Sequence, residues 1–216
     1  MPRRATTTGA KTRETILQTA ADVASVEGLD GLSIGRLAET LGMSKSGLFA
    51  HFGSKEDLQL ATIEAAGKRY VDEVVVPSLA SDSGITRLRA LCESFLSYVE
   101  RGVFPGGCFF AAAMAEFGGK APGPVRDRIA ENQDLWMSSL ASAAEDARGK
   151  RELRADIDPR QLAFELEGAL LSANWYFYLN SDHTYLERAR RAVRTQLANA
   201  ATRTGLRSLS LDPGGI

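Results

Sequence analysis

The chain has 216 residues, of which 44% are hydrophobic and 25% charged, and its 26 basic and 27 acidic side chains leave a formal net charge of −1. This length allows one large domain, or a small domain beside a larger one, and the composition excludes a disordered or collagen-like chain. Because the total charge is near zero, any contact with nucleic acid must come from a local basic patch, helix dipoles and geometry.

Cysteines, histidines and apolar runs exclude further classes. Cys92 and Cys108 lie far apart in apolar surroundings, so we interpret them as buried side chains and not as a disulfide or zinc ligands. The two histidines are too isolated to form a ligand pair, and we expect no metal and no cofactor. Residues 1–13 lack the apolar stretch of a signal peptide, and the apolar run 108–115 is too short to span a membrane. The sequence predicts a cytoplasmic protein without a membrane partner.

Apolar residues recur at helical spacing along most of the chain, and we identify no convincing strand. In the N-terminal part, Ser33 and Ser44 are suitable N-cap residues, while Gly28, Gly42 and Gly53 are suitable helix ends. A loose capping-box pattern opens a fourth helix, which we expect to end before a proline. The helices predicted here cover residues 12–27, 34–41, 45–52 and 55–76.

Longer helices are predicted in the rest of the chain, where Asp158 followed by Pro159 makes a strong helix start. They cover residues 85–99, 108–117, 124–148, 159–180 and 184–203. The predicted fold is all-α, with about nine helices: an N-terminal three-helix unit, then a C-terminal helical bundle. We place the domains at 1–55 and 56–204, and expect a flexible tail over 205–216.

The second and third helices form a helix-turn-helix pattern, a motif in which a supporting helix, here 33–41, would hold a reader helix, here 44–52, against DNA. The reader begins with small or long polar side chains, as entry into a major groove about 12 Å wide requires. Gly47 weakens the helix, and close approach to DNA would explain it. Because two-helix turns are common, an ordinary helical hairpin remains the alternative on pattern alone. The predicted buried side consists of Ile34, Leu37, Leu41, Leu48 and Phe52.

The residue string favours DNA binding. Met-Ser-Lys-Ser-Gly-Leu-Phe-Ala-His-Phe at 43–52, followed by Ser-Lys-Glu-Asp-Leu at 54–58, resembles the TetR family of bacterial regulators, in which Val-Ser-Lys-Gly-Thr-Leu-Tyr-His-Tyr-Phe precedes Ser-Lys-Glu-Glu-Leu. The resemblance covers about residues 12–65. It implies a DNA-binding transcriptional repressor that leaves a palindromic operator when a small apolar or amphipathic ligand binds, with ligand binding and dimerisation assigned to 56–204.

The sequence departs from the family at three positions. Phe49 stands where a tyrosine hydroxyl commonly bonds a DNA phosphate, Ala24 stands where a core aromatic is common, and Gly35 occupies an often polar position. The operator sequence is therefore not transferable. The residues predicted to bind double-stranded operator DNA are Ser33, Arg36, Ser44, Lys45, Ser46, Gly47, Phe49, His51 and Lys55.

Individual roles follow from these positions. Lys45 is the best candidate for a base or phosphate contact, and His51 and Lys55 flank the reader as phosphate contacts. The alternatives are a solvated histidine and an ordinary first-turn lysine. A basic arm could add phosphate or minor-groove contacts, although a solvated tail is an equal alternative. The arm consists of Arg3, Arg4, Lys11 and Arg13.

The family resemblance implies an unknown small-molecule ligand, and the C-terminal bundle is rich in aromatic and methionine side chains. Apolar pockets with few polar groups are the usual form of such sites, but aromatics at helical spacing are more often plain core. The candidate pocket residues are Phe95, Tyr98, Phe104, Phe109, Phe110, Met114, Phe117, Trp136, Met137, Trp175 and Tyr178.

Helix 159–180 carries two apolar stripes, so one can face its own subunit while the other needs a partner. A two-fold mate is the commonest solution, and the last helix offers a second surface. The alternative is one large monomeric core. The predicted homodimer interface consists of Phe164, Leu171, Trp175, Tyr178, Leu186, Ala189, Val193 and Leu197.

Two other classes of function compete with a regulator: a helical-bundle enzyme and an assembly module without specific DNA binding. The Gly-Met-Ser-Lys-Ser-Gly string at 42–47 is no nucleophile elbow, because it lies in a helix-turn-helix and has the wrong spacing. The sequence also has no Glu-x-x-His pair of the kind that binds di-iron centres. We therefore expect a non-enzymatic protein.

Overall fold

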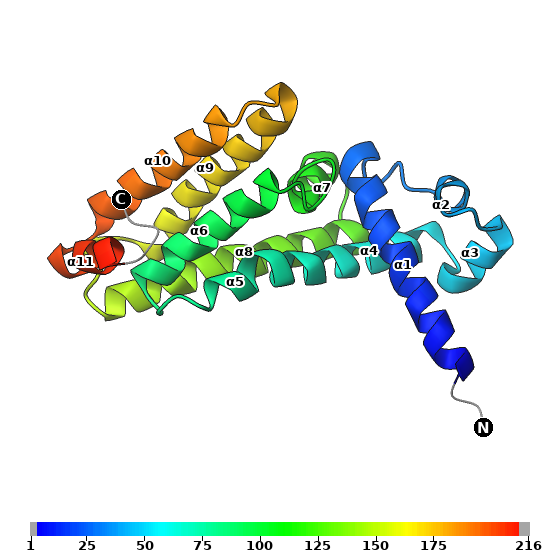
Figure 1. Ribbon diagram of the computed structural model, residues 1–216, viewed down its shortest axis with the longest axis horizontal. Coiled ribbons are helices and arrows are strands. Elements are labelled where there is room, and N and C mark those ends of the chain that lie inside the picture. The colour runs from blue at the N-terminus through cyan, green and yellow to red at the C-terminus, as the bar shows by residue number, and fades with distance from the viewer. Residues whose placement is uncertain (1–3, 212–216) are drawn as a thin grey trace. The chain divides into compact units, whose positions relative to one another are not determined.

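The structure is a computed structural model that describes the backbone of residues 4–211 and the side chains of residues 12–210. Over these residues the regular secondary structure consists of helices joined by turns and loops, with one isolated antiparallel bridge between Leu153 and Ala201 (Figure 1). The predicted all-α fold is confirmed. The chain divides into two compact units, which we call the reader unit (Met1–Arg69 with Phe104–Asn132) and the bundle unit (Tyr70–Val103 with Gln133–Ile216).

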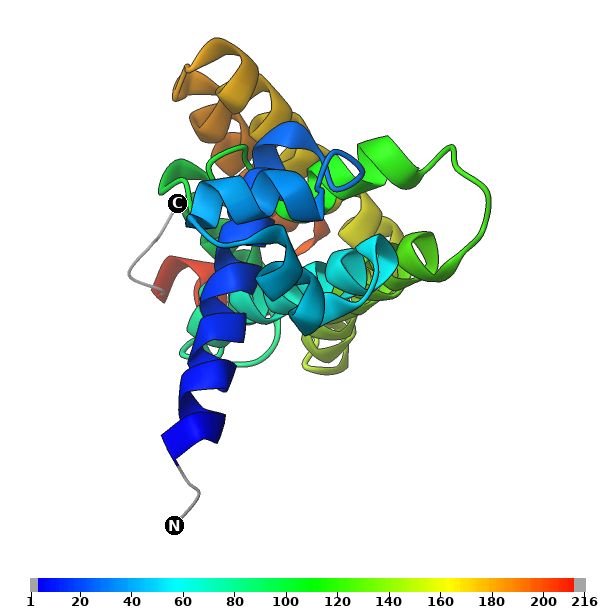
Figure 2. The same cartoon turned by 90° about the vertical axis from the view of Figure 1, so that its right-hand side faces the viewer.

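The reader unit contains α1 (Arg4–Glu27), α2 (Ile34–Leu41), α3 (Lys45–Phe52), α4 (Lys55–Tyr70) up to Arg69, α7 (Phe109–Phe117) and the first part of α8 (Pro124–Gly149). Helices α2 and α3 have the predicted bounds, and α2 packs against both α1 and α3 (Figure 2). Helix α7 also packs against α1, so this unit includes residues beyond 55 that the sequence analysis placed in the second domain.

Burial of apolar side chains holds the reader unit together. Leu37, Leu48 and Phe52 are buried as predicted, whereas Ile34 and Leu41 are only half-buried. Helix α1 begins at Arg4, earlier than predicted, so the basic arm is partly helical. Arg3 and the side chains of Arg4 and Lys11 lie outside the described residues. The guanidinium of Arg13 lies over the Phe52 ring, 5.2 Å from its centroid.

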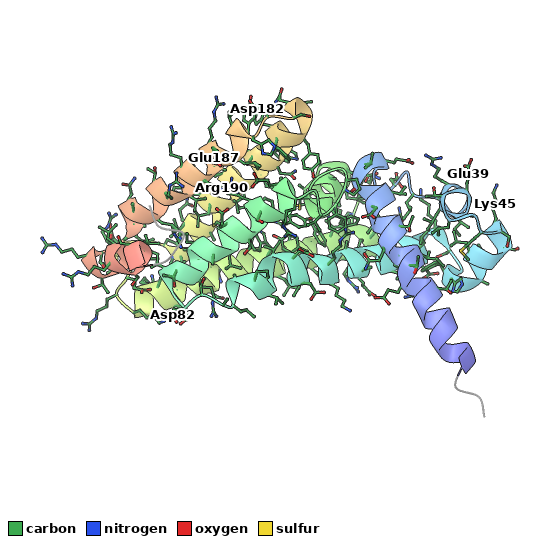
Figure 3. The ribbon with its side chains drawn as sticks, in the orientation of Figure 1. Glu39, Lys45, Asp82, Asp182, Glu187 and Arg190 are labelled. Atoms are coloured by element: carbon green, nitrogen blue, oxygen red, sulfur yellow. The ribbon has the colours of Figure 1, made fainter. Side chains whose placement is uncertain are left out.

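The bundle unit contains the π-helix η1 (Val71–Val75), α5 (Val76–Ser78), α6 (Ile85–Glu100), the rest of α8, α9 (Pro159–Asn180), α10 (Thr184–Ala200) and α11 (Arg203–Leu211). Helices α6, α9 and α10 pack against one another (Figure 1). Arg190 of α10 donates to Glu93 and Glu100 of α6 and to Glu187 of its own helix (Figure 3). These ion pairs join α6 to α10.

The helical segment that begins with α4 ends at Ser78, close to the predicted end near residue 76, and Pro77 lies within its last turn. The chain continues helically through Ser78, because it widens to a π-helix at 71–75, where the Val76 N–H bonds the Val71 oxygen. A proline has no N–H to donate and its ring collides with the carbonyl four residues earlier in an α-helix. The wider π-helical turn accommodates Pro77, so the helical segment continues into α5.

The C-terminal segment differs from the flexible tail expected over 205–216. Helix α10 ends at Ala200, and α11 follows over Arg203–Leu211 with Leu209 buried. Glu152 holds this helix: its carboxylate accepts hydrogen bonds from Ser208 Oγ at 2.8 Å and from the Ile85 N–H at 3.0 Å. Residues 212–216 lie outside the described part of the chain.

Candidate DNA interface

Two serines form the N-caps of the helix-turn-helix. Ser33 Oγ accepts from the Arg36 N–H at 3.2 Å, and Ser44 Oγ accepts from the Gly47 N–H at 3.1 Å. Between them, Gly42 adopts φ 64°, a left-handed conformation that suits glycine and turns the chain from α2 into α3. The sequence predicted both serines as DNA contacts, and the structure gives their hydroxyls a local role in starting the helices.

The cap also gives a local reason for Gly47. A Cβ at this position would lie 3.0 Å from Ser44 Oγ, closer than ordinary van der Waals contact. The sequence interpretation explained this glycine only by close approach to DNA. Substitution of Gly47 would therefore disturb the start of the reader helix even without DNA.

The reader helix separates a buried face from an exposed one. Leu48 and Phe52 are buried, while Lys45, Ser46 and Phe49 are exposed, with Phe49 52% exposed. Lys45 lies beside the start of α2, since a Cβ on Gly35 would be 3.3 Å from its Cε (Figure 3). The predicted contacts at the start of α3 thus share one accessible surface, while His51 is half-buried near its end.

Arg36 and Lys55, both predicted DNA contacts, have partners inside the reader unit. Arg36 donates to Glu27 of α1 at 3.0 Å, and this hydrogen bond raises the pKa of Arg36. Lys55 Nζ donates to the Asp30 carbonyl at 2.6 Å and to Asp30 Oδ1 at 3.2 Å. Both cations remain half-exposed, so a phosphate would compete with these partners.

The α1–α2 turn contains an acidic residue that the sequence analysis did not single out. The carboxylate of Asp30 accepts from Lys120 at 2.8 Å as well as from Lys55, and hydrogen bonds from Lys120 and Lys55 hold the pKa of Asp30 below its usual range. The backbone of the same turn donates to Glu116 of α7: the Leu29 and Asp30 N–H groups each bond its carboxylate at 2.8 Å. No local sequence signal marks these contacts, because they join distant segments.

The candidate ligand residues fall into both units. Phe104, Phe109, Phe110, Met114 and Phe117 belong to the reader unit, where the rings of Phe104 and Phe109 are 5.8 Å apart. Phe95, Tyr98, Trp136, Met137, Trp175 and Tyr178 belong to the bundle unit. All of the phenylalanines in this set, with Tyr98 and Trp136, are buried, whereas Trp175 is exposed and Met114, Met137 and Tyr178 are half-buried.

A buried acid, which the sequence analysis missed, lies within the bundle unit. Glu167 of α9 accepts from Trp136 Nε1 at 2.7 Å and from Gln133 Nε2 at 3.2 Å. Burial raises the pKa of Glu167, against these two hydrogen bonds, which lower it. The Trp136 ring stacks near Phe95 and meets Tyr70 edge to face at 5.4 Å. The cluster therefore places a buried carboxylate beside packed aromatic rings.

In the described part of the chain, at least two hollows open on the bundle unit, and the predicted aromatic residues line neither of these two. One, of about 460 Å³, lies between α6 and α10, and the other, of about 670 Å³, lies between α8 and the segment before α9. The lining of the first includes Cys92, Leu96 and Val193 as well as Arg89 and Arg194, and the second is lined mainly by polar groups. Burial raises the pKa of the Cys92 thiol.

The predicted dimer surface needs a correction on α10. Leu186, Ala189, Val193 and Leu197 are buried within the bundle unit itself, because α10 packs its apolar stripe on α6 and α9. They are not available to a partner. On α9, Phe164 is 67% and Trp175 50% exposed, while Leu171 and Tyr178 are half-buried. Two exposed residues of this helix, Tyr176 and Leu179, were not among the predicted interface residues.

Along the described part of the chain, no helix has the length and apolar character needed to cross a membrane.

Comparison with known proteins agrees with this geometry. Residues 84–193 match the family described as "Tetracyclin repressor-like, C-terminal domain", and residues 16–62 match "Bacterial regulatory proteins, tetR family". The HTH-type transcriptional regulator TcmR of Streptomyces glaucescens is 24% identical over 180 residues, which make up 80% of this chain and 76% of TcmR.

Solved structures have the same fold. A TetR transcriptional regulator from Chloroflexus aurantiacus is similar with a TM-score of 0.83 and 25% identity, over 90% of this chain and 98% of that one. SCO4454 from Streptomyces coelicolor has a TM-score of 0.75 at 20% identity, with 94% and 98% covered. AibR, solved with isovaleryl coenzyme A and operator DNA, has a TM-score of 0.65 at 21% identity, with 87% and 96% covered. The chain belongs to the TetR family and is a DNA-binding transcriptional regulator, as the resemblance of the reader segment implied.

Proposed function

We propose that the protein is a repressor that binds a palindromic operator as a homodimer and releases it when a small apolar or amphipathic molecule binds. The observation that supports operator binding is the exposed start of α3, where Lys45 and Ser46 are accessible. Ser44 caps this helix, and the buried Leu48 packs it against the core. A reader helix enters the major groove by this end. The DNA-contact residues named above are the ones that this mode of binding would use.

The dimer is supported by α9. Its outer face exposes Phe164, Trp175, Tyr176 and Leu179 along one side of a long helix, while its opposite face is buried in the bundle unit. An isolated exposed apolar residue is common, but a row along one helix indicates a contact surface. A two-fold mate would present two reader helices to successive major grooves, about 34–36 Å apart on DNA.

The ligand response is supported by the aromatic residues and by a structural relative. AibR was solved with isovaleryl coenzyme A and operator DNA, so that fold accommodates both kinds of molecule. In this chain, the cluster of Tyr70, Phe95 and Trp136 beside Glu167 supplies aromatic surface next to a hydrogen-bonding carboxylate, the kinds of group that small-molecule sites use. A ligand releases DNA only if it prefers the conformation that binds DNA poorly.

A DNA-retention experiment tests the regulator function. The full-length protein is incubated with the DNA upstream of its own gene and, separately, with random DNA of equal length and composition, at two salt concentrations. We expect tighter binding to the upstream DNA, by at least about a thousandfold over random DNA. Equal retention of both would contradict operator recognition and favour an assembly module.

The ligand response is tested with the same complex. A panel of apolar and amphipathic molecules is added, and tryptophan fluorescence, melting temperature and DNA retention are followed together. We expect an inducer to change the fluorescence of Trp136 or Trp175, raise the melting temperature and lower retention. A panel without any such molecule would leave a constitutive regulator as the better description.

A further inference from the structure

The α1–α2 turn is held between α7 and α4 within the reader unit. On one side, both carboxylate oxygens of Glu116 accept backbone N–H groups, from Leu29 and Asp30, at 2.8 Å each. On the other side, Gln59 of α4, which is buried, donates to the Leu29 oxygen at 2.9 Å. Because the turn is hydrogen-bonded to both helices, a displacement of α7 that moves the turn also strains its hydrogen bond to α4.

The same turn reaches the end of the reader helix. Lys55 begins α4 directly after Gly53 and Ser54, which end the reader, and its Nζ donates to two oxygens of Asp30. The contacts therefore run from α7 through Glu116, the turn and Asp30 to Lys55. Hydrogen bonds to charged groups are roughly twice as strong as neutral ones, so these contacts restrain the turn and the start of α4.

The turn is shaped to receive the carboxylate. Gly28 adopts φ 84°, and a Cβ there would lie 3.1 Å from Glu116 Oε1, so the absence of a side chain lets the acid approach the backbone. Next to α7, the Gly106 N–H donates to Ser25 Oγ at 3.1 Å, and a Cβ on Gly106 would collide with the Ser25 carbonyl. The segment before α7 and α7 itself thus both contact the C-terminal end of α1.

We propose that Glu116 is a positioning residue for DNA binding: it fixes the α1–α2 turn and, through Asp30 and Lys55, the place and tilt of the reader helix. A displacement of α7 then changes operator recognition. This inference rests on the proposed operator binding and adds a physical route by which aromatic residues on α7, such as Phe110, affect the reader. Glu116 itself touches no DNA in this mechanism.

The test compares Glu116→Gln with Glu64→Gln. The first replacement keeps the shape but leaves an amide group that can accept only one of the two N–H groups. The second removes the same charge from the reader unit by breaking an exposed ion pair with Arg128, away from the turn. Binding is measured on operator and on random DNA, at a temperature where melting curves show each variant fully folded.

We expect Glu116→Gln to lower the ratio of operator to random binding on the order of tenfold, the equivalent of one hydrogen bond to a charged group. Glu64→Gln should leave the ratio unchanged. A lower melting temperature with an unchanged ratio would show that Glu116 only stabilises the fold, and equal losses in both variants would show a general charge effect. Either result overturns the proposal.

A second measurement needs no DNA, so it separates this inference from the proposed function. Hydrogen exchange is followed at the amides of Leu29 and Asp30 and at those of Leu48 and Phe52 in the reader. We expect Glu116→Gln to accelerate exchange at both places, because a loosened turn frees the end of α3. Faster exchange confined to Leu29 and Asp30 would show that the effect of the substitution stops at the turn. This result would contradict positioning of the reader helix, whether or not an operator exists.

Discussion

The indole N–H of Trp136 donates to the carboxylate of Glu167 over 2.7 Å, which fixes a buried acid between α8 and α9. Burying an ionised carboxylate costs free energy unless hydrogen bonds replace its water, and here Trp136 and Gln133 supply such hydrogen bonds. Burial nevertheless prevails and the pKa of Glu167 is raised.

This raised pKa makes stability depend on pH. A carboxyl group whose pKa is higher in the folded state binds a proton more tightly there, so its contribution favours folding below the unfolded-state pKa. The contribution is lost as pH rises through the folded pKa. Glu167→Gln removes this dependence, and we expect the variant to gain melting temperature relative to wild type as pH rises from about 4 towards neutral. Parallel melting curves at all pH values would show that Glu167 titrates normally.

Lys45 should carry part of the DNA affinity, because it is exposed at the start of the reader. If it bonds a base, Lys45→Ala weakens operator binding by roughly 1–3 kcal/mol; if it bonds only phosphate, all DNA is weakened alike and the salt slope falls by about one unit. Lys68→Ala, an exposed lysine near the end of α4, is the control. Unchanged binding of Lys45→Ala to both operator and random DNA would remove Lys45 from the interface.

Local features of the sequence predicted the helix-turn-helix well. The caps at Ser33 and Ser44 and the turn at Gly42 depend on residues within four positions, so α2 and α3 have the predicted bounds. The turn contacts could not be predicted in this way, since Glu116 is 87 residues from Leu29. Helix α11 was missed for the same reason, because distant Glu152 holds it.

The error on α10 has a different cause. Its apolar stripe shows that one face is buried but does not show what covers it. The structure covers Leu186 and Leu197 with helices of the same chain, so the stripe needs no second subunit. Helix α9 has two apolar faces, and the sequence alone does not show which of them is buried. Only the three-dimensional packing shows that Phe164 lies on the exposed face.

Phe49 offers a gain-of-affinity test. Its ring is 52% exposed on the reader, at the position where the family commonly has a tyrosine. Phe49→Tyr adds one hydroxyl without disturbing packed atoms, and a hydroxyl bonded to a phosphate contributes about 1 kcal/mol. We expect operator and random DNA to gain about equally in filter-binding titrations. No gain on either DNA would mean that the ring edge does not face a phosphate.

Asp30 should restrain Lys55 and Lys120 in the DNA-free protein. Asp30→Asn removes a negative charge and releases two ammonium groups, so binding to random DNA should increase and its salt slope steepen by about one unit. Phosphate contacts carry no sequence information, so the released ammonium groups strengthen binding to any DNA. The substitution also weakens the link from the turn to Lys55, so the affinity for the operator should increase less than the affinity for random DNA. The ratio of the two affinities is the readout; a ratio that rises would contradict restraint by Asp30. Asp57→Asn is a control, since its carboxylate bonds Ser54 within the same unit.

The outer face of α9 is the part of the dimer prediction that can be tested most directly. Phe164→Glu places a charge in the proposed apolar contact, where an unpaired buried charge costs several kcal/mol, so the dimer should dissociate at micromolar concentration. Leu135→Glu is matched to it, because Leu135 is 68% exposed on α8 and is likewise replaced by a charge. Light scattering after size exclusion gives the mass of each variant, and melting curves show that each is folded.

Because one reader helix contacts few base pairs, the monomeric variant should also lose specific operator binding while keeping much of its random binding. A wild-type protein that is monomeric at micromolar concentration and still binds its operator tightly would rule out this interface, and equal dissociation by Leu135→Glu would move it away from α9.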